Sequence, residues 1–147
     1  TDQSVILIDH LKHIYIDGEL ETIESGVYFN RLYQKKYTVV VNATGSSLDD
    51  PDQHYAENYG CGAPRNFNGY CSPALTALIG AQSRERDVGT RRGIVREIER
   101  KLAEDIVRPI ITHPVAAACQ QPYVKGLTIM VNTIYNGWRY EDVWLYR

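Results

Sequence analysis

The amino-acid sequence predicts an α/β fold on two observations. Residues 19–24, 25–36 and 37–44 have the patterns of a strand, a helix and a second strand, and the last of these, YTVVVNAT, is the clearest buried strand. A strand, a helix and a strand within about 30 residues form a βαβ unit, which belongs to a parallel sheet. From about Ala118 onward, helical spacing ends and aromatic-rich extended chain follows.

The first elements can be placed from the spacing of apolar residues. Val5, Ile8 and Leu11 recur at helical spacing, which predicts a helix over residues 2–13, and Gly18 breaks this pattern. The ELETIE stretch then alternates apolar and acidic residues, as a half-buried strand does. SGVYFNRLYQKK regains helical spacing, with its first residue, serine, as a candidate N-cap. The loop GSSLDDPDQ follows the YTVVVNAT strand, and ligands of open α/β sheets bind at such strand ends.

Two further helices carry start signals in the sequence. Asp50 and Pro51 open one over about residues 51–60, because aspartate is a good N-cap and proline suits the first helical position. Ser72 and Pro73 open the second by the same logic, and we expect it to end near position 83. The polar loop between these two helices contains two of the three cysteines.

The remaining chain is predicted to form one long helix and then extended structure. The helix covers about residues 88–105, and its buried stripe consists of Ile94, Val95, Ile98, Leu102 and Ile106. RPIITH, residues 108–113, is a predicted strand. Beyond Ala118, two extended segments are expected on either side of a turn at YNG, residues 135–137.

Composition and charge exclude several classes of protein. The 147 residues suffice for one domain with a core, and 44% hydrophobic and 23% charged residues are typical of a globular chain. A net charge of −2 argues against nucleic-acid binding, which needs a clustered basic surface. No apolar run approaches the roughly 18 residues of a transmembrane helix. The first residues do not resemble a signal peptide. A signal peptide that has been cleaved, or further sequence upstream of Thr1, stays open.

Cys61 and Cys71 flank the loop GAPRNFNGY, whose glycine, proline and asparagine residues let the backbone fold back. The two cysteines can therefore approach within disulfide distance, and a disulfide would indicate an oxidising compartment. Two alternatives stay open. The cysteines could be unpaired on the surface of a cytosolic protein, or they could bind zinc, although no CxxC motif and no histidine lie in the loop. Cys119 is left over, either free and buried or paired outside this chain.

A search of the sequence for known catalytic and metal-binding motifs identifies no active site. His10 and His13, beside Asp9, have metal-ligand spacing, but without a third ligand a polar helix face is the simpler interpretation. The aspartates of LDDPDQ could hold a divalent cation, although helix capping explains part of that cluster. His113 and Cys119 could suggest a thiol nucleophile, but six positions of extended chain separate them. We therefore predict no catalytic residue, no metal and no cofactor.

Three stretches, in order along the chain, point to a known family. They are LDDPDQHYAENYGCGAPRNFNGYCSPALTALI, RRGIVREIERKLAEDIVRPIITH and CQQPYVKGLTIMVNTIYNGWRYEDVWLYR. Together they resemble the C-terminal third of family 5 extracellular solute-binding proteins, the peptide-, nickel- and opine-type binding components of ABC importers. The likeness covers nearly the whole chain and includes the closing GWRYEDVWL block. In some members a cysteine pair flanks the same loop, so the resemblance implies a Cys61–Cys71 disulfide.

The resemblance implies a fragment of a two-lobed, type II periplasmic-binding-protein-like fold. Residues 1–118 would form the second half of the C-terminal ligand-binding lobe, and residues 119–147 would cross the hinge and pack on the first lobe. The change of composition near Ala118 agrees with this division. By the same resemblance, the whole protein would bind a peptide or other polar solute between its lobes and deliver it to an ABC permease in the inner membrane. Its location would be periplasmic or extracytoplasmic.

By resemblance, the ligand site includes the loop after the YTVVVNAT strand. The residues expected to face the ligand are Thr44, Gly45, Ser46, Ser47 and Asp49. Peptide binders of this family carry an aspartate four residues before the proline of the DP pair, where it holds the free amine of the peptide. That position is Ser47 here, and a serine cannot form the ion pair. Longer peptides, sugars, opines or other polar solutes stay open, and Asp49 or Asp50 could replace the missing charge.

Two other functions are kept as alternatives. The chain could be a non-catalytic interaction domain, because its eleven tyrosines suit a protein-binding surface. It could also be a small thiol enzyme that uses His113 and Cys119. As an isolated fragment, it could dimerise through exposed strand edges of residues 119–147. The sequence does not identify the solute.

Overall fold

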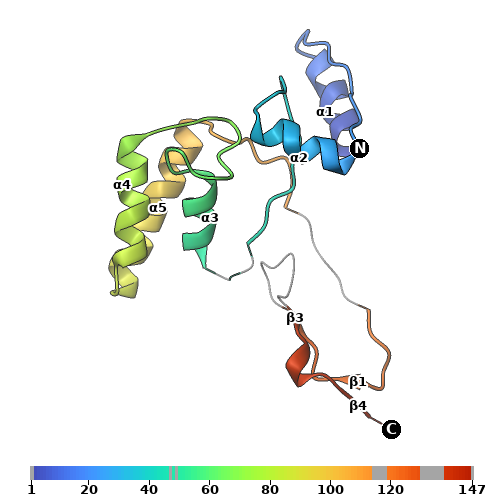
Figure 1. Ribbon diagram of the computed structural model, residues 1–147, viewed down its shortest axis with the longest axis vertical. Coiled ribbons are helices and arrows are strands. Elements are labelled where there is room, and N and C mark those ends of the chain that lie inside the picture. The colour runs from blue at the N-terminus through green and yellow to red at the C-terminus, as the bar shows by residue number, and fades with distance from the viewer. Residues whose placement is uncertain (1, 47, 49, 114–118, 130–137, 147) are drawn as a thin grey trace. The chain divides into compact units, whose positions relative to one another are not determined.

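The computed structural model describes residues 2–46, 48, 50–113, 119–129 and 138–146 (Figure 1). The chain divides into two compact units, residues 1–43 and residues 44–147. Within the described residues, the first contains two helices, and the second contains three helices followed by short antiparallel strand pairs. None of the helices in the described ranges has the length and apolar character that spanning a bilayer requires.

The first unit consists of α1 (Asp2–Lys12), α2 (Ser25–Tyr33) and the segments around them. Both helices were expected, and α1 ends within one residue of the predicted boundary. The N-cap of α2 is Glu24 rather than the predicted serine, and no side chain caps the helix start. The hydroxyl of Tyr28 donates to the backbone oxygen of Val41 at 3.2 Å and to the side chain of Asn42 at 3.0 Å. These bonds tie α2 to the segment that follows it.

The prediction of two strands in this part of the chain is wrong. Residues 19–24 and 37–44 contain no strand, so they form no βαβ unit with α2. A strand needs a hydrogen-bonded neighbour and a surface to cover, and the exposed fraction of Val39 is 76%. The β-branched sequence therefore has strand propensity without a partner within the described residues. The two-lobed α/β fold stays a prediction.

The second unit begins with α3 (Pro51–Asn58), α4 (Pro73–Arg84) and α5 (Val88–Glu104). The predicted caps are confirmed: the side chain of Asp50 accepts from the Asp52 N–H, and Ser72 accepts from the Leu75 N–H. Asp87 caps α5 in the same way through the Thr90 N–H. These bonds satisfy amide donors that a helix start otherwise leaves unpaired.

Helices α3, α4 and α5 pack side by side around one apolar core (Figure 1). Its buried members are Tyr55, Leu75, Ile79 and Ile98. The α5 stripe predicted from the sequence is confirmed at four positions, because Ile94, Val95 and Leu102 pack against this core beside Ile98. The prediction that the fifth position, Ile106, is buried is wrong. Ile106 lies beyond the helix with a φ of 48°, and its exposed fraction is 70%.

The described residues that follow α5, 105–113, are irregular, and a two-stranded ribbon lies farther along the chain. Residues 108–113, predicted as a strand, contain none, and the exposed fractions of Ile110 and Ile111 are 71% and 47%. Farther along, β1 (Val124–Lys125) pairs antiparallel with β4 (Trp144–Leu145), and β2 (Thr128–Ile129) pairs with β3 (Trp138–Arg139). The prediction of extended segments is confirmed at these four short strands, whereas residues 140–142 form a 3₁₀ turn, and residues 116–118 and 130–131 lie outside the described residues. The turn predicted at residues 135–137 lies outside the described residues.

The registers of the two strand pairs in the ribbon differ by two residues. Lys125 faces Trp144 across the first pair, whereas Thr128 faces Arg139 across the second. Two residues on one strand therefore oppose four on the other, which include the 3₁₀ turn η1 (Tyr140–Asp142). Gly126 lies opposite this turn with a φ of 78°, and a Cβ atom there would be 2.0 Å from the backbone oxygen of Asp142. The bulge therefore requires glycine.

Candidate functional site

The loop before α3 contains the predicted ligand-facing residues. Thr44 is exposed, and Gly45 and Ser46 are half-buried, whereas Ser47 and Asp49 lie outside the described residues. The hydroxyl of Ser46 accepts from the Leu48 N–H and donates to the Gln53 side chain, both at 3.2 Å. The Ser46 hydroxyl group therefore points toward α3, and its two hydrogen bonds stabilise the turn before this helix. Among the described candidates, Thr44 is the exposed one, and it is therefore the most accessible for a ligand contact.

Asp50, at the end of this loop, accepts hydrogen bonds from both a side chain and the backbone. It accepts two hydrogen bonds from the Arg91 guanidinium, at 2.6 and 2.8 Å, while it caps α3 through the Asp52 N–H at 2.9 Å. The hydrogen bonds from Arg91 lower the pKa of the Asp50 carboxyl group below its usual value, and the cap bond adds to this shift. Because its charge is already matched by Arg91, Asp50 is poorly placed to bind the amine of a ligand.

A buried amide joins this ion pair to the neighbouring helix. Gln82 on α4 is fully buried, and its side-chain oxygen accepts from Arg91 at 3.1 and 3.2 Å. Its nitrogen donates to the carboxylate of Asp52. The network connects the starts of α3 and α5 to α4 and satisfies the hydrogen-bonding groups of a side chain that water cannot reach. No local sequence pattern predicts this network, because Asp50 and Arg91 are 41 residues apart.

The other end of α3 contributes a polar and aromatic cluster. The hydroxyl of Tyr55 donates to the carboxylate of Glu99 on α5. Burial raises the pKa of Tyr55, and the hydrogen bond to Glu99 raises it further, so the phenol stays protonated. The guanidinium of Arg108 lies 5.0 Å from the ring centre of Tyr59 and 5.8 Å from that of Phe67. This is cation–π geometry within a half-buried cluster.

His54 belongs to the same cluster. Its ring lies edge-on to Tyr59, with ring centres 5.6 Å apart. Burial lowers the pKa of His54, and the positive charge of Arg108 lowers it further, so the imidazole is favoured in its neutral form. In the described part of the chain, no group of three or more metal-ligating side chains is arranged to hold an ion. The cluster packs α3 against α5 and the chain beyond it, and its contacts indicate a structural role.

Cys61 and Cys71 form a disulfide, with Cα atoms 4.6 Å apart. The unpaired and zinc-binding alternatives are therefore wrong for this pair. The loop between the cysteines folds back through Gly62 and Gly69, which have φ values of 71° and 73°. The side chain of Asn66, inside the loop, donates to the backbone oxygens of Gly60 and Tyr70. The loop thus has its own hydrogen bonds in addition to the covalent link.

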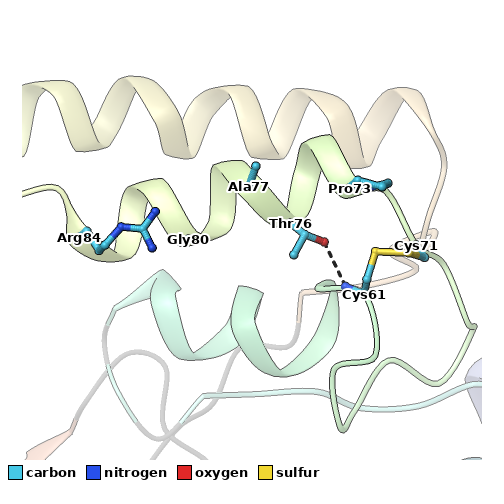
Figure 2. A pocket seen from close by; sticks show the side chains of 7 residues that line it. All are labelled: Cys61, Cys71, Pro73, Thr76, Ala77, Gly80 and Arg84. Carbon is cyan, nitrogen blue, oxygen red and sulfur yellow. Dashed lines mark hydrogen bonds between the residues drawn. A yellow bond between two sulfur atoms is a disulfide. The ribbon is translucent and has the colours of Figure 1, made fainter.

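An open groove runs from the disulfide along one side of α4 (Figure 2). It has a volume of about 560 Å³ and is lined by Cys61, Cys71, Pro73, Thr76, Ala77, Gly80 and Arg84. The hydroxyl of Thr76 accepts from the Cys61 N–H at 3.1 Å and donates to the backbone of Ser72 at 2.9 Å. Sequence reasoning missed this groove, because it depends on how the disulfide lies against the helix.

The residues of the predicted thiol enzyme form no recognisable site in the described chain. His113 and Cys119 are both exposed. Residues 114–118, between them, lie outside the described residues. Within the described ranges, no hydrogen bond joins Cys119 to a histidine that could activate its thiol.

Comparisons with known proteins give no relative for this chain. A scan against protein-family models, a search of curated proteins and a search of solved structures each find no match. The family resemblance therefore rests on the sequence stretches described above, and it stays a prediction.

Proposed function

We propose that this chain is the C-terminal part of the substrate-binding component of an ABC importer of the family 5 type. The whole protein would close two lobes around a peptide or other polar solute and present it to a membrane permease. The observation that carries this proposal is the resemblance of three stretches, in the right order, over nearly the whole sequence. No chemical reaction is part of the proposed role.

The disulfide supports this proposal. The resemblance implies that the cysteine-flanked loop is exported and tied just before a helix. Cys71 directly precedes Ser72, the N-cap of α4, and is bonded to Cys61. Disulfides persist in oxidising compartments such as the bacterial periplasm, which fits a periplasmic or extracytoplasmic location.

The exposed apolar side chains of the first unit also support it. They include Val5, Ile6, Ile14, Tyr15, Ile16, Leu20, Val27, Phe29, Tyr33 and Val39. Soluble proteins rarely leave large contiguous apolar surface in water, and such surface marks contacts with other protein. A segment that belongs to a larger lobe would cover these side chains with the rest of that lobe.

The charges near the predicted loop narrow the proposed solute. Ser47 replaces the aspartate that binds a free amine, and Asp50 is matched by Arg91. We therefore propose a solute recognised through hydrogen bonds more than through a cationic amine, such as a longer peptide, a sugar or an opine. Asp49 is the remaining candidate for a charged contact in this loop, and it lies outside the described residues.

A thermal-shift screen tests the proposal on this chain and on the longer protein that it implies. The library would contain di- to pentapeptides, opines, oligosaccharides and chelated metals. A ligand at about one hundred times its Kd stabilises the folded state by about 2.7 kcal/mol. We expect a shift for the longer protein but not for residues 1–147 alone, because the solute would be buried between two lobes.

A pair of variants of the longer protein connects any ligand to the loop. Thr44→Ala should weaken binding, whereas Thr38→Ala, a matched change at an exposed position outside the loop, should not. Nanomolar binding by residues 1–147 alone, or no shift in either protein with any class of solute, would contradict the proposal.

A protein-interaction domain is the second candidate, and the C-terminal ribbon favours it. Its exposed aromatic side chains include Tyr123, Tyr140, Trp144 and Tyr146. Tyrosine and tryptophan are enriched at protein interfaces. Concentration-dependent self-association in analytical ultracentrifugation, without any small-molecule binding by the longer protein, would favour this function.

A further inference from the structure

The Cys61–Cys71 disulfide lies at the surface, with both cysteines exposed. Both also line the open groove along α4, so a small reagent can reach them (Figure 2). A disulfide reacts by attack of an external thiolate on one of its sulfur atoms, so access is the first requirement. The groove meets this requirement.

The loop between the cysteines is also held by bonds that do not involve sulfur. From the chain after α5, Arg108 donates to the backbone oxygen of Arg65 at 2.6 Å, and Val107 accepts from the Asn68 side chain at 2.6 Å. The hydroxyl of Tyr70 donates to Asp105 at 2.6 Å. These three contacts anchor the middle and the end of the loop to one segment of the chain.

The first cysteine has an anchor of its own. The Cys61 N–H donates to the hydroxyl of Thr76 on α4, and Cys71 precedes the N-cap of the same helix. Within the loop, Asn66 bridges the backbone oxygens of Gly60 and Tyr70, the residues just before each cysteine. Both ends of the loop therefore stay together through hydrogen bonds, even without the covalent link.

We propose that Cys61 and Cys71 form a reversible thiol–disulfide site whose reduced form is a preorganised dithiol that chelates thiophilic ions such as trivalent arsenic. This inference does not depend on the proposed transport function. It follows from the exposure of the pair together with the hydrogen bonds that keep the two cysteines close after reduction.

The reduction is a two-electron exchange with an external dithiol. One thiolate of the reductant attacks the Cys61 sulfur, the protein S–S bond breaks, and Cys71 leaves as a thiolate. Cys71 is the better leaving group, because it directly precedes the N-terminus of a 12-residue helix, which favours negative charge. The second reductant thiolate then releases Cys61 and closes the oxidised reductant as a cyclic disulfide, and both protein thiolates take up protons.

Capture of the arsenical is a condensation in which the arsenic stays trivalent. The two thiols displace the oxygen of phenylarsine oxide, two sulfur–arsenic bonds form, and one water molecule leaves. A chelate that closes on two thiols already held together loses less conformational freedom than one that must first gather them. The hydrogen bonds around the loop should therefore increase the affinity of the reduced protein for the arsenical.

The test uses the whole 147-residue chain with Cys119→Ser, which removes the exposed free thiol. The protein is reduced with dithiothreitol, freed of reductant without oxygen, and titrated with phenylarsine oxide, with 2,3-dimercaptopropanol as competitor. Native mass spectrometry should give one arsenical per chain. Asn68→Ala with Tyr70→Phe, which cuts two anchors of the loop, should weaken binding about tenfold. The control pair, Asn30→Ala with Tyr15→Phe in the first unit, should leave it unchanged.

Hydrogen exchange of the reduced Cys119→Ser protein provides a test that does not rely on the loop variants. We expect the amides of residues 61–71 to keep most of their protection, together with those of α3–α5. The proposal is overturned if reduction exposes this loop while the helices stay protected. It is also overturned if the reduced protein binds the arsenical no more tightly than it does after unfolding in urea.

Discussion

Helices α1 and α4 have almost the same length, 11 and 12 residues, and both carry apolar residues at helical spacing. Their surroundings differ. In α4, Leu75 and Ile79 are buried against neighbouring helices, whereas α1 has no buried residue, and Val5 and Ile6 are more than half exposed. A sequence pattern is therefore enough to predict a helix, whereas a core also requires complementary surfaces on neighbouring elements. Residues 51–104 supply those surfaces for α4.

The largest expected effect is the loss of a core side chain from α5. Ile98→Ala should destabilise the second unit by about 2–5 kcal/mol, because the side chain is fully buried and its removal leaves a cavity. Val5→Ala, the matched truncation in α1, should change the stability of the first unit by less than about 0.5 kcal/mol. Native-state hydrogen exchange would report each unit separately. Equal losses of stability from the two variants would contradict the difference in packing between α1 and α5.

Removal of the disulfide should have the next largest effect. Cys71→Ser with Cys61→Ser opens a loop of about eleven residues and should lower the free energy of unfolding by about 2.5–3 kcal/mol. The reason is the greater freedom of the unfolded chain, which the disulfide restricts. Urea unfolding followed by circular dichroism would measure the change. Because the folded loop keeps its hydrogen bonds, the native spectrum itself should be unchanged, and a changed spectrum would contradict this interpretation.

The ion pair of Asp50 and Arg91 should stabilise the second unit alone, because within the described residues it joins helices of that unit only. Arg91→Ala should cost about 1–3 kcal/mol, since it removes several hydrogen bonds and leaves the oxygen of buried Gln82 short of donors. Arg92→Ala, at an exposed neighbouring position, should stay within about 0.5 kcal/mol. The midpoints of urea unfolding for the two variants would measure this difference in stability.

The pH dependence of this ion pair has a definite sign. Arg91 lowers the pKa of Asp50 in the folded state, so the carboxylate contributes stability above its unfolded pKa of about 3.9. That contribution is lost as the pH falls through the lower, folded pKa. The Arg91→Ala variant should therefore lose less stability than the wild type on acidification below about pH 4. Identical acid profiles would show that the pair is not stabilising.

The smallest expected effect concerns His54. Its folded pKa is lowered by burial, so below the unfolded value of about 6.5 the unfolded chain takes up the proton more readily than the folded protein. Stability of the second unit should therefore fall as the pH drops below about 6.5, and His54→Gln should remove this dependence. Urea unfolding at several pH values would measure it. The exposed His10→Gln in the first unit is the matched control and should leave the slope unchanged.

The sequence predicted well what is decided locally. Asp50 and Ser72 were recognised as caps, since capping involves residues only two or three positions apart. The apolar spacing of α5 identified Ile98 as core. Strands at residues 19–24, 37–44 and 108–113 failed, because strand formation depends on a partner elsewhere in the chain.

The candidate site was less predictable for the same reason. Arg91 and Gln82 reach the predicted loop from distant helices, and Arg108 reaches the cysteine loop from beyond α5. None of these contacts has a local sequence signature. The cysteine pair was foreseeable because the turn-forming residues that bring it together lie between the two cysteines.

Gly126 has a consequence for how substitutions would be tolerated along the C-terminal ribbon. A position in a thin, solvent-bathed ribbon would ordinarily accept almost any residue. Here the backbone oxygen of Asp142 occupies the space that any side chain would need, and the left-handed φ adds to the penalty. A bulkier residue would force the strands to slip, and a slip of one residue would turn Trp144 to the opposite face. Saturation mutagenesis should therefore find its sharpest intolerance in the ribbon at the residue that contributes no side chain at all.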